Sequence, residues 1–129
     1  MNVRDIADSA IEIPIVTSFT KIGYLTRRKL DDWTSLTDYD FTGRVVLLTG
    51  ATSGLGRCAA QRFAEQGATL VVVGRSAERN QGVVDELIES TGNEQISQVA
   101  CDTGEYDDVR ELADRFLADH DRLDVLVNN

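Results

Sequence analysis

A glycine-rich turn between an apolar strand and a helix limits what this chain can fold into. Residues 45–49 form a short apolar β-run, and three glycines follow with the spacing Gly-x-x-x-Gly-x-Gly, at Gly50, Gly54 and Gly56. The first glycine permits a sharp turn out of the strand. The second lets an anion approach the main chain, and the third lets the next helix pack closely on the sheet. Between a strand and a helix, this pattern is typical of a dinucleotide phosphate site.

From residue 44 onwards, apolar strands alternate with helical segments. The predicted strands are 45–49, 69–73, 96–100 and 123–127, and the predicted helices are 55–66, 77–90 and 107–119. Helices of this length between apolar strands indicate right-handed βαβ units, in which a parallel sheet is covered on both faces. The predicted fold class is α/β, with a doubly wound parallel sheet that ends after its fourth strand, and residues 41–129 form this domain.

Two expectations concern packing at the end of the chain. On the last predicted helix, one apolar side contains Val109, Leu112, Phe116 and Leu117. The last predicted strand, 123–127, has no strand after it in this sequence. We therefore expect its edge to be apolar and unpaired, which favours aggregation or pairing with another chain.

Residues 1–40 differ from this pattern and are predicted to form a helical extension. Apolar residues recur at helical spacing and predict an amphipathic helix over residues 14–29, at Ile15, Val16, Phe19 and Ile22. The second half of this helix is basic, and Trp33 follows it. A basic helix beside a tryptophan can lie on a membrane surface. Alternatively, the apolar stripe packs on the domain or on a partner subunit, so residues 14–33 are a candidate contact with either.

Composition excludes several classes of protein. The net charge is −9, from 22 acidic and 13 basic residues, so nucleic-acid binding by general electrostatics is not expected. No apolar stretch approaches the ~20 residues that cross a bilayer, and the N-terminus does not resemble a signal peptide. We therefore predict a cytoplasmic protein. Cys58 and Cys101 are expected to be buried free thiols, and His120 has no Cys or His neighbour, so no metal site is predicted.

Three motifs, in the right order and at the right distances, resemble those of short-chain dehydrogenases/reductases. Residues 49–56 look like the family's Thr-Gly-x-x-x-Gly-x-Gly cofactor motif. Asp102 follows the third strand, where the family keeps an aspartate that contacts adenine. Residues 126–129, Leu-Val-Asn-Asn, resemble the start of its Asn-Asn-Ala-Gly motif. The resemblance covers residues 41–129 and implies a Rossmann-type fold that binds NAD or NADP. Residues 18–33 also resemble the branch around dehydrogenase/reductase member 12.

The end of the second strand indicates which dinucleotide is preferred. An enzyme that prefers NAD places an acidic residue there for the ribose hydroxyls, whereas this chain has Val-Gly-Arg-Ser over residues 73–76. The planar guanidinium of Arg75 suits a 2′-phosphate, and Ser76 can donate a further hydrogen bond. In the alternative interpretation, Arg75 is a solvated surface residue and Ser76 only caps the next helix. The sequence favours NADP over NAD.

The candidate cofactor-binding residues lie after the carboxyl ends of the four strands. They are Gly50, Thr52, Ser53, Gly54, Leu55, Gly56, Arg75, Ser76, Asp102, Thr103 and Asn128. Asp102 contacts the adenine ring if the resemblance holds, or else caps the following helix. Asn128 either lies near the adenine ribose or ties neighbouring strands together.

No catalytic residue is predicted on this chain. The family's chemistry depends on a serine, a tyrosine and a lysine four residues after the tyrosine, and none of Tyr24, Tyr39 and Tyr106 has such a lysine. We expect a fragment that is inactive alone. The resemblance implies an NADP-dependent oxidoreductase that acts on a small carbonyl or alcohol substrate, as a homo-oligomer when full length. The alternative is a non-catalytic dinucleotide-binding or regulatory module.

Overall fold

The computed structural model describes residues 24–25, 28–29 and 38–129, and the chain divides into two compact units, Met1–Asp38 and Tyr39–Asn129. In the first unit, residues 24–25 and 28–29 are helical and exposed, within the helix predicted over residues 14–29. The remainder of that helix and Trp33 lie outside the described residues. The membrane or subunit contact of residues 14–33 and the resemblance to the finer branch therefore stay predictions. Among the described residues, no helix is both long enough and apolar enough to span a bilayer.

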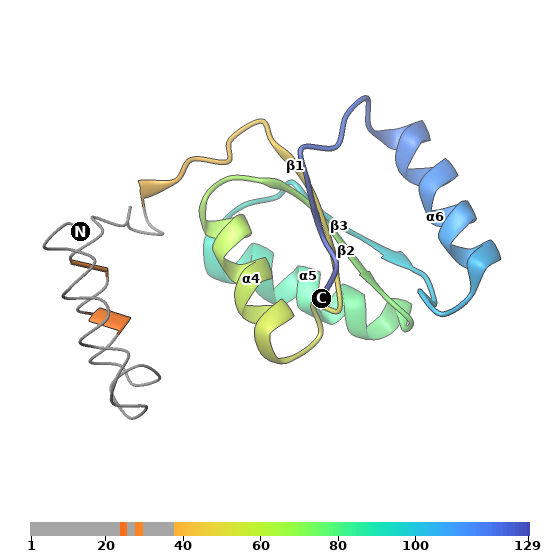
Figure 1. The fold of residues 1–129 in the computed structure, drawn as a ribbon, viewed down its shortest axis with the longest axis horizontal. Helices are drawn as coiled ribbons and strands as arrows, with labels where there is room; N and C mark the ends of the chain where they lie inside the picture. Colours follow the sequence, from red (N-terminus) through yellow and green to blue (C-terminus); the bar gives the residue numbers. More distant parts are fainter. Residues whose placement is uncertain (1–23, 26–27, 30–37) are drawn as a thin grey trace, which may run out of the picture. The chain divides into compact units, whose positions relative to one another are not determined.

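A parallel four-stranded sheet forms the centre of the second unit (Figure 1). Its strands are β1 (Val45–Thr49), β2 (Thr69–Gly74), β3 (Ile96–Ala100) and β4 (Val125–Val127), in the order β3-β2-β1-β4. β1 pairs with β2 on one side and with β4 on the other, so the chain changes direction across the sheet after β3. Such a switch point places a ligand site outside the carboxyl ends of the strands. The predicted doubly wound parallel sheet is confirmed.

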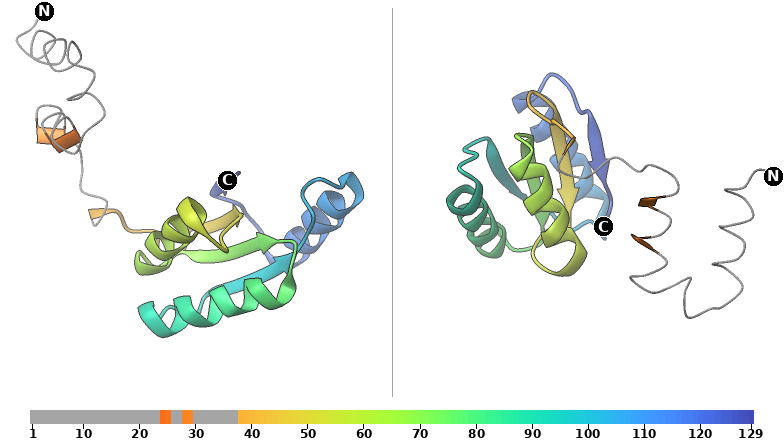
Figure 2. Two further views of the ribbon diagram at one scale, coloured as in Figure 1. Left: turned by 90° about the horizontal axis from the view of Figure 1, so that it is seen from below. Right: turned by 90° about the vertical axis from the view of Figure 1, so that its left-hand side faces the viewer.

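Three helices connect the strands and cover the sheet from two sides. They are α4 (Gly54–Glu65), α5 (Ala77–Thr91) and α6 (Tyr106–Asp119). α4 and α5 lie on one face and α6 lies on the other (Figure 2). α5 begins at the cap Ser76 and ends at Gly92, whose positive φ of 71° allows its amide to bond Ile88. Each helix lies within one residue of its predicted bounds at both ends.

The core explains why the strands are apolar without interruption. Because β1 and β2 are covered on both faces, alternate residues of each strand face opposite layers. Four side chains belong to the layer of α4 and α5: Val46, Leu48, Leu70 and Val72. The four between them belong to the layer of α6: Val45, Leu47, Val71 and Val73.

Helix α6 buries less of its apolar side than the sequence predicts. Leu112 and Phe116 are buried against the sheet, but Val109 is 38% exposed and Leu117 is 71% exposed. The predicted apolar side is therefore buried only in part, at Leu112 and Phe116. Val109 and Leu117 line an open groove beside β4, where no described segment covers them.

One carboxylate fixes the start of β4 against the start of β1. Asp124 accepts a hydrogen bond from the Val45 amide at 2.9 Å and pairs with Arg44 at 3.1 Å and with Arg122. The Val45 amide and then the two guanidinium groups lower the pKa of Asp124 to about 2. Because these contacts occupy residue 124, β4 begins at Val125 and not at the predicted residue 123.

Candidate functional site

The glycine turn has the geometry that its spacing predicts. Gly50 adopts a φ of 69°, and its amide bonds the carbonyl of Val73 at 3.0 Å, which joins the end of β1 to β2. A Cβ at Gly56 would lie 2.2 Å from the carbonyl oxygen of Gly50. Only a residue without a side chain lets α4 pass so close to the turn. The predicted roles of the first and third glycines, in turning and in close packing, are confirmed.

The start of α4 leaves its amide groups available to a ligand. Ser53 is the N-cap, with extended backbone, and its side chain makes no capping hydrogen bond. The first turn contains no acidic residue, and a Cβ at Gly54, whose φ is 55°, would meet nothing within 4 Å. Thr52, Ser53, Gly54 and Leu55 are all exposed. The amides and the positive end of the helix dipole can therefore bind an anion.

A groove of about 430 Å³ runs along the carboxyl ends of β1, β2 and β3. Five of the predicted cofactor residues line it: Gly50, Thr52, Arg75, Asp102 and Thr103. Among the lining residues, Arg75 is the only cation and Asp102 the only carboxylate. Ser53, Gly54, Leu55 and Gly56 belong to the adjoining turn and helix start, and Ser76 follows Arg75. The structure thus brings these ten predicted residues to one edge of the sheet.

Arg75 and Ser76 have different surroundings. Arg75 is exposed, immediately after Gly74 at the end of β2. The Ser76 hydroxyl accepts a hydrogen bond from the Arg79 amide at 3.3 Å, so Ser76 is the N-cap of α5. The capping alternative for Ser76 is confirmed, and its contact with a cofactor stays a prediction.

Asp102 shapes the turn after β3. Its carboxylate accepts the Gly104 amide at 3.0 Å, and its own amide donates to Asp108 at 3.2 Å. The N-cap of α6 is Glu105, whose side chain makes no capping bond. Asp102 therefore does not cap α6, so that alternative is wrong. Its carboxylate is half-buried beside the groove, where a ligand could reach it.

The two cysteines differ in burial. Cys101 is buried, as predicted, and also lines the groove. Cys58 on α4 is exposed, so the prediction of two buried thiols is wrong for Cys58. Burial raises the pKa of the Cys101 thiol, and nearby carboxylates, Asp108 foremost, raise it further. The thiol is therefore neutral at physiological pH. Among the described residues, no cluster of three or more His, Cys, Asp or Glu could hold a metal ion.

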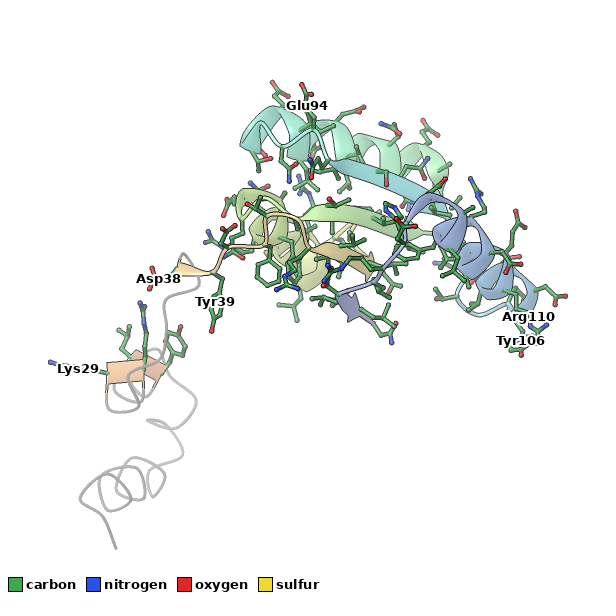
Figure 3. All side chains as sticks on the ribbon, turned by 90° about the horizontal axis from the view of Figure 1, so that it is seen from above. Lys29, Asp38, Tyr39, Glu94, Tyr106 and Arg110 are labelled. Atoms are coloured by element: carbon green, nitrogen blue, oxygen red, sulfur yellow. The ribbon has the colours of Figure 1, made fainter. Side chains whose placement is uncertain are left out.

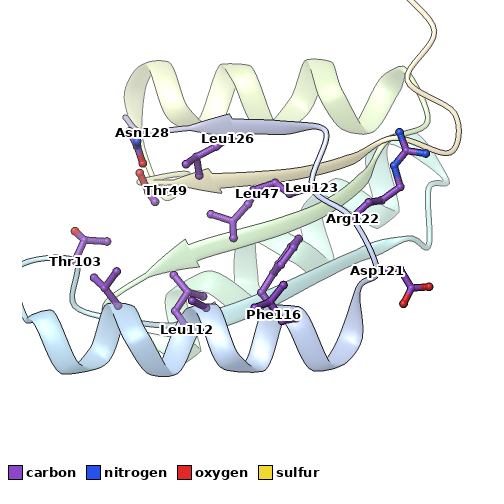
Figure 4. A pocket seen from close by; sticks show the side chains of 13 residues that line it. Leu47, Thr49, Thr103, Leu112, Phe116, Asp121, Arg122, Leu123, Leu126 and Asn128 are labelled. Atoms are coloured by element: carbon purple, nitrogen blue, oxygen red, sulfur yellow. The ribbon is translucent and has the colours of Figure 1, made fainter.

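The two final asparagines face different grooves. Asn129 lines the groove with Arg75, and its side chain donates to the carbonyl of Gly50 at 3.3 Å. The backbone amide of Asn129 also donates to the Thr49 hydroxyl at 3.0 Å. Asn128 lines an adjoining apolar groove beside β4, which shares Thr49 and Thr103 with the Arg75 groove (Figure 4). Adjacent residues of an extended chain point to opposite sides, so the predicted tying of strands belongs to Asn129.

Sequence reasoning missed Asn129 and four other lining residues of the Arg75 groove: Thr49, Val73, Gly74 and Cys101. The second residue of the Asn-Asn pair could have indicated Asn129.

At the start of α6, Tyr106 is followed four residues later by Arg110, which donates to the Tyr106 hydroxyl at 3.0 Å and lies over its ring (Figure 3).

Comparison with known proteins agrees with this geometry. The model of the short chain dehydrogenase family matches residues 44–129. An uncharacterized oxidoreductase of Mycobacterium tuberculosis is 39% identical over 88 residues, which cover 67% of this chain and 26% of the relative. Retinol dehydrogenase 12 of Mus musculus is 31% identical over 119 residues, which cover 89% of this chain and 38% of the relative. The chain thus spans well under half the length of these relatives.

A solved structure gives the same fold. A metagenomic short-chain oxidoreductase in complex with NADP is 36% identical and superposes with a TM-score of 0.64. The match covers 69% of this chain and 39% of that protein.

Proposed function

This chain belongs to the short-chain dehydrogenase/reductase family of oxidoreductases, and from this premise we propose that it binds NADP at the carboxyl edge of its sheet. The longer protein would transfer a hydride between nicotinamide and a small carbonyl or alcohol, in the cytoplasm and as a homo-oligomer. The observation that carries the proposal is the groove in which Arg75, and no acidic residue, follows β2.

The residues of the glycine turn suit the pyrophosphate. Thr52, Ser53 and the amides from Gly54 to Gly56 surround the uncapped start of α4, and a side chain at Gly54 would point into open space. A pyrophosphate there would accept hydrogen bonds from the amides and interact favourably with the helix dipole.

The other end of the groove suits the adenosine half of NADP. Asp102 and Thr103 line the end of β3, where they can contact adenine, and Arg75 extends from the end of β2. A guanidinium binds a 2′-phosphate through paired, charge-assisted hydrogen bonds. The solved relative in complex with NADP supports this choice over NAD. When bound, the nicotinamide would supply or accept the hydride.

A second candidate is a non-catalytic module that binds a dinucleotide. The groove with Arg75 accounts for dinucleotide binding, which this candidate shares with the enzyme. The name of the mouse relative, a retinol dehydrogenase, favours catalysis on an alcohol or carbonyl in the longer protein. Turnover of NADPH with simple aldehydes and ketones by the longer protein would support the enzyme. Tight binding of NADPH by that protein without turnover would support the module.

Calorimetric titration of the chain with NADPH and with NADH tests the proposed cofactor. We expect tighter binding of NADPH, and we expect Arg75→Ala to lower the NADPH-to-NADH affinity ratio about tenfold or more, as for loss of a charged hydrogen-bond donor. Arg79→Ala is the matched control, because Arg79 is also exposed but lies outside the groove. An unchanged ratio in Arg75→Ala would refute the assignment of Arg75. Absence of binding by either dinucleotide would refute the function.

A further inference from the structure

Asn80 is the only polar or charged residue that is buried among those described, and it lies five residues after Arg75 in the sequence. It sits in the first turn of α5, and its exposed fraction is 0%. Its side-chain Nδ2 donates to the carbonyl of Gly74 at 2.9 Å and to the carbonyl of Val99 at 3.2 Å. Both partners can only accept, so the amide nitrogen must face them. Asn80 thereby joins the ends of β2 and β3 to α5.

The same residue holds both neighbours of Arg75. The Asn80 side chain binds the carbonyl of Gly74, and the Asn80 backbone amide binds the carbonyl of Ser76 at 2.9 Å. The carbonyl of Gly74 also accepts the Cys101 amide at 3.0 Å, so one oxygen connects β2, β3 and α5. The backbone of Arg75 is therefore fixed on each side by one residue.

Gly74 and Asn80 are tightly packed against each other. A Cβ at Gly74 would lie 2.6 Å from Oδ1 of Asn80, so the two residues fit only as a pair. That oxygen is buried and has no hydrogen-bond partner. A buried amide oxygen without a donor is destabilising, and an apolar side chain of similar size would avoid this cost. The unpaired oxygen therefore offsets part of the stabilisation from the two hydrogen bonds of Nδ2, and the direct effect of the side chain is to fix the two strand ends.

We propose that Asn80 is a positioning residue that aims Arg75 at the 2′-phosphate of NADP. It acts through the carbonyl of Gly74 and does not touch the cofactor. This inference rests on the proposed function, in which Arg75 distinguishes NADP from NAD. Without the side-chain amide, the carbonyl of Gly74 keeps only its bond from the Cys101 amide, so the end of β2 can shift and the Arg75 side chain is held less firmly.

Asn93 provides a matched comparison at the opposite end of β2. Its Nδ2 also donates to two main-chain carbonyls, those of Ala64 at 3.2 Å and Ala68 at 2.9 Å. Asn93 is partly buried and lies outside the Arg75 groove. A change there removes the same kind of contact without touching the segment that carries Arg75.

The test compares Asn80→Leu with Asn93→Leu by calorimetric titration with NADPH and NADH. The loss of one typical hydrogen bond corresponds to about a fivefold change in an equilibrium constant, and we expect Asn80→Leu to lower the NADPH-to-NADH affinity ratio by that factor. Asn93→Leu should leave the ratio unchanged. In the Arg75→Ala background, Asn80→Leu should not lower the ratio further. An unchanged ratio in Asn80→Leu, or an equal fall in Asn93→Leu, would overturn the inference.

Amide hydrogen exchange separates this inference from the proposed function. The Cys101 amide should exchange faster in Asn80→Leu than its global stability requires, because its acceptor Gly74 has moved. Protection as in the unaltered chain would overturn the positioning role, whatever the cofactor results. If Arg75→Ala keeps the affinity ratio while Cys101 loses protection, Asn80 still positions the strand end, and it is the assignment of Arg75 that fails. Asn80→Ala, which also removes the side-chain amide, supplies the same readouts if the leucine variant does not fold.

Discussion

The two faces of the sheet are covered by helices to different degrees. On one face, α4 and α5 enclose a cluster of buried residues that includes Leu48, Leu70 and Leu87, each with no exposed surface. On the other face, α6 packs on residues of β1, β2 and β3, and an apolar groove of about 680 Å³ remains open next to β4 (Figure 4). Leu117 and Leu126, which line it, are 71% and 53% exposed.

The difference in packing between the two faces shows which contacts hold the cofactor groove in place. The enclosed face ends at the glycine turn, where helix and strand touch through Gly50 and Gly56. The groove with Arg75 is built from the ends of β1, β2 and β3, and two of its lining residues, Val73 and Cys101, are buried on the α6 face. The open face contributes apolar surface beside β4. The cofactor edge is therefore fixed by packing on both faces, and the exposed apolar surface beside β4 lies next to it.

The largest expected effect contrasts one leucine from each environment. Leu48 is fully buried and Leu126 is 53% exposed. Leu48→Ala should lower the free energy of unfolding by about 2 to 5 kcal/mol, because it leaves a cavity. Leu126→Ala should change it by no more than about 0.5 kcal/mol. Urea titrations followed by circular dichroism measure both. Equal losses would mean that the groove is closed in solution, and the contrast between the faces would disappear.

The second effect concerns the contact between the turn and α4. Gly56→Ala places a Cβ against the carbonyl of Gly50, and overpacking of this kind should cost about 1 to 3 kcal/mol of stability and weaken NADPH binding. Gly82→Ala on α5 is the matched control, since a Cβ there meets nothing within 4 Å. Alanine in place of a helical glycine should instead stabilise the chain by about 1 kcal/mol. If both variants melted at the same temperature, close packing at Gly56 would be refuted.

The smallest effect concerns the strand that borders the open face. Asp124 has its pKa lowered to about 2 in the folded chain, from an ordinary 3.8. A lowered pKa stabilises the fold at pH values above the ordinary one, and this contribution is lost as the pH falls from about 4 towards 2. Asp124→Asn should therefore be less stable than the unaltered chain at pH 6, and the difference should shrink below pH 4.

The control for this pH dependence is Asp114→Asn, because Asp114 is exposed on α6. Its stability difference from the unaltered chain should not follow the same pH profile. A constant difference for Asp124→Asn between pH 6 and pH 2.5 would contradict the role of the contacts with Val45, Arg44 and Arg122.

The sequence predicted what local patterns determine. The apolar strands, the helical periods between them and the Gly-x-x-x-Gly-x-Gly spacing are each encoded by neighbours in the chain, and the parallel sheet followed from their alternation. Capping of the next helix by Ser76 also depends on neighbours in the chain, so the sequence could offer it as an alternative. Arg75 is exposed beside the groove as predicted, although its contact with NADP stays a prediction.

What the sequence did not predict depends on contacts between distant segments. Asn80 stands on α5 beside an apolar stripe, and its burial is apparent only once the ends of β2 and β3 lie beneath it. The exposure of Leu117 depends on what covers the sheet beside β4, which no helical period can reveal. The choice between Asn128 and Asn129 turns on strand register, where a shift of one residue reverses the side.

The most direct test of the account is to map NADPH binding by amide chemical shifts. The central claim is that the dinucleotide lies along the carboxyl ends of β1, β2 and β3, and that the larger apolar groove does not take part. The account predicts shift changes concentrated at residues 49–56, 74–76, 101–104 and 129, with little change at Leu117, Leu123 and Leu126 of the apolar groove. Changes concentrated in the apolar groove, with the glycine turn unaffected, would contradict it.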